Sequence, residues 1–254
     1  MPKTRLPSAT SHKLESVDSA AVPQQVLSPR QILHYLIAIL LMSIYGVQVC
    51  PFVEELTLAE IMSPLVLIGI VQYVFRYFVA ANYIPEQAYE KQATTVFATE
   101  WGLFLLSGVF LAAHNTVTYD FPLHSGMKLI VGYLAIGFFV ATDLALERDF
   151  RVITHLQKTT AALALQSSAT LTRKFSLFIS CTLILLTTVL FLIINKDLTW
   201  LEEASAKIPF DIAQQAIMGE LAFVGAIILF FLLLLSHGFT RNLSLRLDAS
   251  AQTL

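Results

Sequence analysis

The sequence has 254 residues, of which 56% are hydrophobic and 13% are charged, and its formal net charge is −2. A soluble protein of this length carries about twice that charged fraction, so composition excludes an ordinary water-soluble domain. The pI near 6.3 gives no basic footprint for nucleic acid, which excludes that class of partner.

Six apolar stretches are predicted to be transmembrane helices, because about 17–25 apolar residues in an α-helix cross the hydrocarbon core of a bilayer. They cover residues 32–50, 61–80, 97–114, 127–147, 175–195 and 221–239. The predicted fold class is therefore all-α, a polytopic membrane bundle of six transmembrane helices.

The flanking segments suggest three parts of the chain. Residues 1–29 are polar and lack the apolar core of a signal peptide, so they are predicted to be a flexible cytoplasmic tail. Residues 30–240 are predicted to be the six-helix transmembrane domain. Residues 241–254 are predicted to be a cytoplasmic exit helix or a HAMP-like stub.

The basic residues predict the orientation of the bundle, because Lys and Arg are enriched on the cytoplasmic side of membrane proteins. Twelve of the sixteen fall before the first stretch, in the second and fourth connections and after the last stretch. Three fall on the opposite side, and Arg76 lies inside the second stretch. Both termini are therefore predicted to be cytoplasmic.

Three ionisable residues lie within the apolar stretches, where charges are costly and mark functional candidates. Arg76, Glu100 and Asp143 are all predicted near the cytoplasmic ends of their helices, so they are candidates for one buried polar cluster. Two interpretations remain open. The cluster is either a structural clamp with snorkelling charges, or a proton relay or substrate site.

The histidines raise two cofactor hypotheses. His34 and His237 are predicted near the same membrane boundary, where paired imidazoles can hold haem iron. His114, Asp120 and His124 share one outer connection and suggest a metal site. No helix carries histidines at two membrane depths, and the loop spacing matches no tight metal motif. We therefore predict no cofactor and no metal.

The segments beyond the fourth and sixth stretches are predicted to be helical. The connection 148–174 has no Gly or Pro, and its apolar spacing predicts one or two amphipathic helices. The last stretch continues without proline into the C-terminal segment. A helix that leaves the membrane without interruption can transmit a movement. The candidate residues for this signal output are Arg241, Leu243, Leu245 and Leu247.

Residues 121–153 carry a more specific pattern, in which a Phe-Pro and a Ser-Gly precede a glycine-rich helix that ends in DLALER. The residues concerned are Phe121, Pro122, Ser125, Gly126, Gly132, Gly137 and 143–148. This pattern resembles the six-helix membrane input or anchor domains of bacterial HAMP-linked signalling proteins, such as class III adenylate cyclases. The sequence has no complete HAMP segment, no cyclase domain and no catalytic motif, so we predict that the chain is not an enzyme.

The resemblance implies an integral membrane signalling or sensor module in the bacterial inner membrane. It relays a stimulus through its last helix to a cytoplasmic output. The implied partners are the lipid bilayer and either a second copy of the chain or a cytoplasmic signalling protein. Two alternatives stay open: a small transporter or channel, and a membrane subunit of a redox complex.

Overall fold

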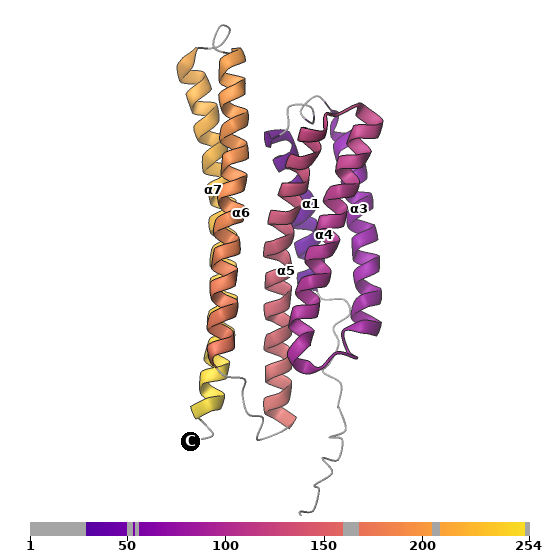
Figure 1. Ribbon diagram of the computed structural model, residues 1–254, viewed down its shortest axis with the longest axis vertical. Helices are drawn as coiled ribbons and strands as arrows, with labels where there is room; N and C mark the ends of the chain where they lie inside the picture. Colours follow the sequence, from indigo (N-terminus) through magenta and orange to yellow (C-terminus); the bar gives the residue numbers. More distant parts are fainter. Residues whose placement is uncertain (1–28, 50–52, 54–55, 160–167, 205–208, 252–254) are drawn as a thin grey trace, which may run out of the picture.

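The computed structural model describes residues 29–49, 53, 56–159, 168–204 and 209–251 (Figure 1). Over these residues, six helices are long and apolar enough to cross a membrane, as the composition predicts. The described part contains helices and turns and no strand. The helices are α1 (Pro29–Val49), α3 (Leu58–Phe78) with the π-helical η1 (Val79–Tyr83), α4 (Tyr89–Tyr119), α5 (Leu123–Thr159), α6 (Ser168–Ala204) and α7 (Phe210–Ala251).

Helix α5 is the centre of the arrangement, because it packs against α1, α4, α6 and α7. Figure 1 shows α1, α3, α4 and α5 as one group, with the long α6–α7 hairpin beside it. Successive helices run in opposite directions. The ends of α5 and α7 therefore lie at the same end of the bundle, which is the lower end in Figure 1.

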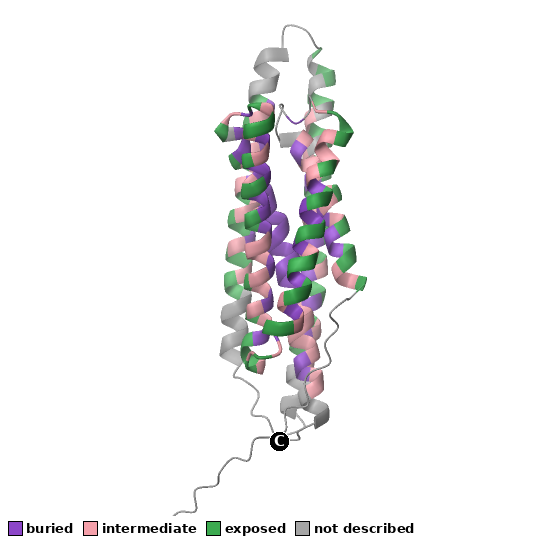
Figure 2. Cartoon of the chain, turned by 90° about the vertical axis from the view of Figure 1, so that its right-hand side faces the viewer, coloured by how far each residue is buried: buried purple, intermediate pink, exposed green. Residues whose placement is uncertain are grey.

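Burial follows the bundle geometry rather than the polarity of the side chains. Figure 2 shows buried residues on the inward faces of the helices and exposed residues on the outward faces. Many of the exposed side chains are large and apolar, an arrangement that suits lipid and would be a liability in water. Examples from α3 and α6 are Leu67, Ile70, Val71, Leu183, Ile184 and Phe191.

Small residues let the central helices approach closely. A Cβ atom at Gly137 on α5 would collide with the Phe104 side chain of α4. A Cβ atom at Gly132 would collide with the Tyr45 ring of α1, and one at Gly108 on α4 would lie 3.2 Å from a backbone atom of α5. These glycines therefore let α5 approach α1 and α4 closely.

Two helix ends have clear local causes. Thr57 and Glu60 form a capping box at the start of α3: the Glu60 carboxylate accepts from the Thr57 N–H at 2.8 Å, and the Thr57 hydroxyl accepts from the Glu60 N–H at 3.4 Å. Helix α4 ends at Asp120, which adopts a left-handed conformation with φ of 56°. Aspartate is one of the few residues that tolerate this conformation.

The connection between α5 and α6 differs from its prediction. One or two amphipathic helices are predicted for it, but its described residues extend α5 to Thr159 and begin α6 at Ser168, while residues 160–167 lie outside the described ones. Residues 148–159 and 168–174 contain no Gly or Pro, so they carry no helix-breaking residue and continue α5 and α6. Helix α7 likewise continues to Ala251. The predicted tail is 1–29; Pro29 begins α1, and residues 1–28 and 252–254 lie outside the described residues.

Candidate functional site

A buried charged pair joins three helices near the lower end of the bundle. The Arg76 Nε of α3 donates to Glu100 Oε1 of α4. The hydroxyl of Tyr35 on α1 donates to Glu100 Oε2 at 2.8 Å. Glu100 is 0% exposed and Arg76 is 6% exposed, so both charges are removed from solvent and depend on each other. We call Tyr35, Arg76 and Glu100 the inner cluster.

A second set of charges centres on Asp143 of α5, which is 1% exposed. Arg30 at the start of α1 binds both carboxylate oxygens, with Nη2 at 2.6 Å from Oδ1 and Nε at 2.9 Å from Oδ2. The Nε2 atom of His34, one turn later on α1, lies 3.0 Å from Oδ2. Asp143 therefore holds the first turns of α1 against α5.

Glu147, one turn beyond Asp143 on α5, collects three guanidinium groups. Its carboxylate accepts from Arg30 at 3.1 Å, from Arg151 at 2.9 Å and from Arg241 of α7 at 2.5 Å. These contacts place the start of α1 and the lower part of α7 at the same end of the molecule. We call the joined set the outer cluster: Arg30, His34, Asp143, Glu147, Arg151 and Arg241.

Helix α7 is fixed to α5 by further contacts next to this cluster. The Arg241 guanidinium carbon lies 3.9 Å from the centre of the Phe150 ring. The fully buried Asn242 donates from Nδ2 to the carbonyl of Leu146 on α5 at 3.1 Å and to the carbonyl of Gly238 at 3.1 Å. A buried polar contact of this kind defines one register between two helices.

The structure divides the predicted polar cluster into two. Arg76 and Glu100 meet as expected, but Asp143 pairs with Arg30 and His34 instead of joining them. The cause is geometric: the start of α1 brings a cation directly to Asp143. A sequence signal for this exists, because Asp143 and Glu147 lie one turn apart, on one face of α5, at the depth where Arg30 begins α1.

The predicted output residues have different surroundings. Arg241 contacts α5, whereas Leu243 is exposed and Leu245 is half-buried. Leu247 lies in α7, but its side chain is outside the described ones. Sequence reasoning missed Asn242, which is the residue of this segment most enclosed by α5. Asn242 follows Thr240 and Arg241 in a polar run, so no sequence signal indicates that its side chain is buried.

The histidines do not meet in the way the haem hypothesis requires. His34 has both ring nitrogens against protein acceptors, Arg30 O and Asp143 Oδ2, while His237 is exposed on α7. His114 contacts the Thr118 hydroxyl at 3.4 Å, and the side chain of His124 lies outside the described ones. Over the described residues, no group of three or more His, Cys, Asp or Glu side chains is arranged for a metal ion.

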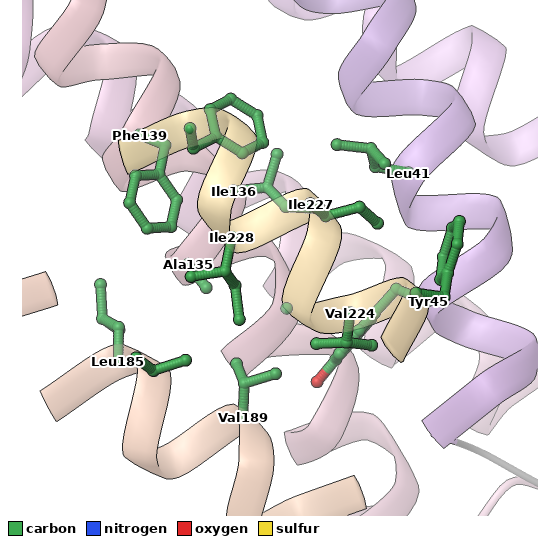
Figure 3. A pocket seen from close by; sticks show the side chains of 14 residues that line it. Leu41, Tyr45, Ala135, Ile136, Phe139, Leu185, Val189, Val224, Ile227 and Ile228 are labelled. Atoms are coloured by element: carbon green, nitrogen blue, oxygen red, sulfur yellow. The ribbon is translucent and has the colours of Figure 1, made fainter. Parts of the chain in front are cut away.

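An apolar cavity of about 70 Å³ lies between α1, α5, α6 and α7. In Figure 3, Leu41, Ile136, Val189 and Ile228 approach the same space from these four helices. The lining contains no charged side chain, so this cavity offers no path for an ion. A transporter or channel thus finds no support in this cavity.

The sequence model of the MASE10 family, a family of membrane-associated sensor domains, matches residues 34–223. A cyclic di-GMP phosphodiesterase of Vibrio cholerae serotype O1 is 26% identical over 197 residues, which are 76% of this chain and 39% of that protein. The chain thus spans about two fifths of the length of this curated relative. No solved structure matches the chain.

These comparisons correct the expected family. They support a membrane sensor domain and do not support the class III adenylate cyclase or HAMP assignment. The pattern in residues 121–153 is too short to distinguish one six-helix membrane domain from another. Its glycines and its acidic end serve the packing of α5 and the outer cluster, which are structural needs of this bundle.

Proposed function

Because the chain belongs to the MASE10 family of membrane-associated sensor domains, we propose that it senses a condition in or at the membrane and reports it through α7. The family supports the sensing role, and the contacts of α7 support the route. A stimulus that shifts α1 or α5 acts on Glu147, and Glu147 holds Arg241 of α7. The outer cluster is therefore the proposed point at which the bundle controls its last helix.

The attachment of α7 to α5 is the observation that carries this proposal. Arg241 and Asn242 are consecutive residues, and both bind α5, one at Glu147 and one at the Leu146 carbonyl. A shift of α7 by one residue along or around its axis would break both contacts together. Interfaces of this kind have discrete arrangements and can switch between them.

We propose that the output controls the turnover of cyclic di-GMP. This rests on the Vibrio cholerae relative, whose name gives it a cyclic di-GMP phosphodiesterase activity. The match leaves about three fifths of that protein outside the sensor-like part. The output domain would stand either on the same polypeptide or on a partner protein that the lower end of α7 contacts.

The lower end of the bundle is proposed to face the cytoplasm of a bacterial cell. The excess of Lys and Arg in the segments at this end supports that orientation. Cyclic di-GMP signalling would then lie on the same side as the end of α7.

Pairing of two chains stays a prediction. The exposed Leu243 face of α7 is the surface that would meet a second copy. Cysteine crosslinking along residues 240–250 in membranes tests this, and no crosslink between chains at any position would refute the dimer.

The proposed function is tested in cells by replacing Asn242→Ala in the native gene and measuring cellular cyclic di-GMP. Loss of the contact with Leu146 should free α7 and shift the cyclic di-GMP level away from that of the wild type. Ser244→Ala is the matched control, because Ser244 is exposed on the same helix and bonds only within it. An unchanged level in both Asn242→Ala and a deletion of the gene would contradict the cyclic di-GMP output.

A further inference from the structure

His34 is held between two groups that can only accept hydrogen bonds. Its Nδ1 lies 2.6 Å from the carbonyl oxygen of Arg30, and its Nε2 lies 3.0 Å from Asp143 Oδ2. Asp143 is ionised here, because Arg30 donates to both of its oxygens. A neutral imidazole has one N–H donor, so satisfying both acceptors requires the doubly protonated imidazolium.

The second proton on His34 lies among several charged groups, so its gain or loss changes the charge balance of the outer cluster. On α1 and α5, the imidazole of His34 faces the carboxylate of Asp143, and Arg30 lies one turn before it on α1. Glu147 lies beyond Arg30, and Arg241 of α7 lies beyond Glu147. Tyr35, next to His34, meets the Arg76–Glu100 pair of α3 and α4. The charged groups of the outer cluster are then three guanidiniums and one imidazolium against two carboxylates: Arg30, Arg151, Arg241, His34, Asp143 and Glu147.

We propose that His34 is a proton-binding site whose occupancy controls the attachment of α7 to α5. This inference rests on the proposed function, in which α7 is the reporting helix. When the imidazole releases a proton to water, one ring nitrogen presents a lone pair to the Arg30 carbonyl or to Asp143. That repulsion moves the first turn of α1, and with it Arg30, away from α5.

Arg30 transmits the change because it binds both carboxylates of the outer cluster, Asp143 and Glu147. Its Nε and Nη2 serve Asp143, and its Nη1 serves Glu147. If Arg30 leaves Glu147, the Glu147 carboxylate keeps only Arg151 and Arg241 as partners. Its side chain can then move toward either of them. Arg30 then no longer holds the Glu147 side chain in the position that meets Arg241. As a result, α7 can move relative to α5.

A disulfide between α5 and α7 provides a direct reporter of this attachment. A Cβ atom at Gly238 would lie 3.8 Å from the Cβ of Leu146. This equals the mean Cβ–Cβ separation in disulfides, about 3.8 Å. Leu146→Cys with Gly238→Cys, in a Cys50→Ser, Cys181→Ser background, should therefore form a disulfide when α7 is docked.

The test follows the rate of this disulfide in lipid nanodiscs between about pH 5 and pH 8, the range in which histidine titrates. The ratio of the disulfide-forming rate with His34 present to the rate of the same pair in His34→Gln should fall as pH rises, by about 10- to 150-fold, the range for losing one hydrogen bond to a charged group. Normalising to His34→Gln removes the pH dependence of thiol ionisation itself. His114→Gln, at the opposite end of the bundle, should retain the response.

A second readout follows the proton in the wild-type protein, and His34→Gln serves only to assign the signal. In protein labelled with ¹⁵N-histidine, one imidazole signal, identified by its absence in His34→Gln, should show two protonated nitrogens at low pH and one at high pH. A signal that stays unchanged over this range, or a crosslinking rate with the same pH profile in His34→Gln, would overturn the inference. Neither readout uses the output, so a normal titration without any cyclic di-GMP response would instead contradict the proposed function.

Discussion

At the scale of single residues, the inner cluster shows what a buried charge pair requires. Glu100 is fully buried, and its two oxygens are used by Arg76 and Tyr35. The pair links α1, α3 and α4 where lipid surrounds the bundle, so neither charge can turn to water. Removing one partner leaves the other charge buried and uncompensated, which costs more than removing both.

We therefore expect Glu100→Gln to lower the free energy of unfolding by about 3–5 kcal/mol, because Arg76 loses its counter-charge. Thermal unfolding of the purified protein in detergent measures this. Glu90→Gln is the control, since Glu90 is exposed at the start of α4 and should change stability by less than about 0.5 kcal/mol. Adding Arg76→Met to Glu100→Gln should recover part of the loss, and a further loss would show that the two residues are not coupled.

Sequence reasoning identified Arg76, Glu100 and Asp143 because a charge inside an apolar stretch is conspicuous. It did not assign Arg30 or His34 to the site, because both stand at the start of an apolar stretch, where a polar residue needs no special explanation. Their role depends on which side chains the fold brings opposite them. The pairing of Arg30 and His34 with Asp143 depends on how α1 packs against α5. The sequence of one helix alone does not predict it.

At the scale of helices, α4 and α5 form the most closely packed pair, and glycines at their contact make this possible. Gly137 lies against Phe104, while Gly102 on α4 has open space where a Cβ would stand. The two positions therefore test packing with the same substitution and the same change in helix propensity.

Gly137→Ala should destabilise the protein by about 1–3 kcal/mol, the usual cost of overpacking a core. Gly102→Ala should be neutral or slightly stabilising, because alanine is the better helix former. Thermal unfolding of the two variants in the same detergent compares them directly. Equal melting temperatures for both variants would show that α4 and α5 do not approach as closely as the structure shows.

The helices themselves were largely predictable, since apolar length alone indicates each span. The residues at which the helices begin and end were harder to predict. The Thr57–Glu60 capping box is a readable start signal for α3, whereas the extension of α5 to Thr159 depends on the absence of a stop signal. Amphipathic spacing in 148–174 predicts one or two helices of their own, but over the described residues the same spacing fits the end of α5 and the start of α6.

At the scale of the whole molecule, the six spans bring the start of α1 and the end of α7 to the same side. Alternation of the basic residues predicts that this side is cytoplasmic. Glu86 lies in the connection between α3 and α4 at the lower end, and Val117, near the end of α4, is exposed at the upper end. These two positions report the two faces of the membrane.

In a Cys50→Ser, Cys181→Ser background, Val117→Cys should react with a membrane-impermeant maleimide on intact cells, and Glu86→Cys should react only after the cells are opened. The physical reason is that the reagent cannot cross the bilayer. The reverse pattern would place the outer cluster and the end of α7 outside the cytoplasm, and would exclude a cytoplasmic output.

Locking α7 to α5 tests the central claim most directly. Cells carrying Leu146→Cys and Gly238→Cys in the native gene, with Cys50→Ser and Cys181→Ser, are treated with a thiol oxidant and then with a reductant, and cellular cyclic di-GMP is measured at each stage. We expect the disulfide to hold cyclic di-GMP at one level whatever the stimulus, and reduction to restore the response. A response that is the same in the oxidised and reduced states, with the disulfide verified by gel mobility, would show that α7 does not carry the signal.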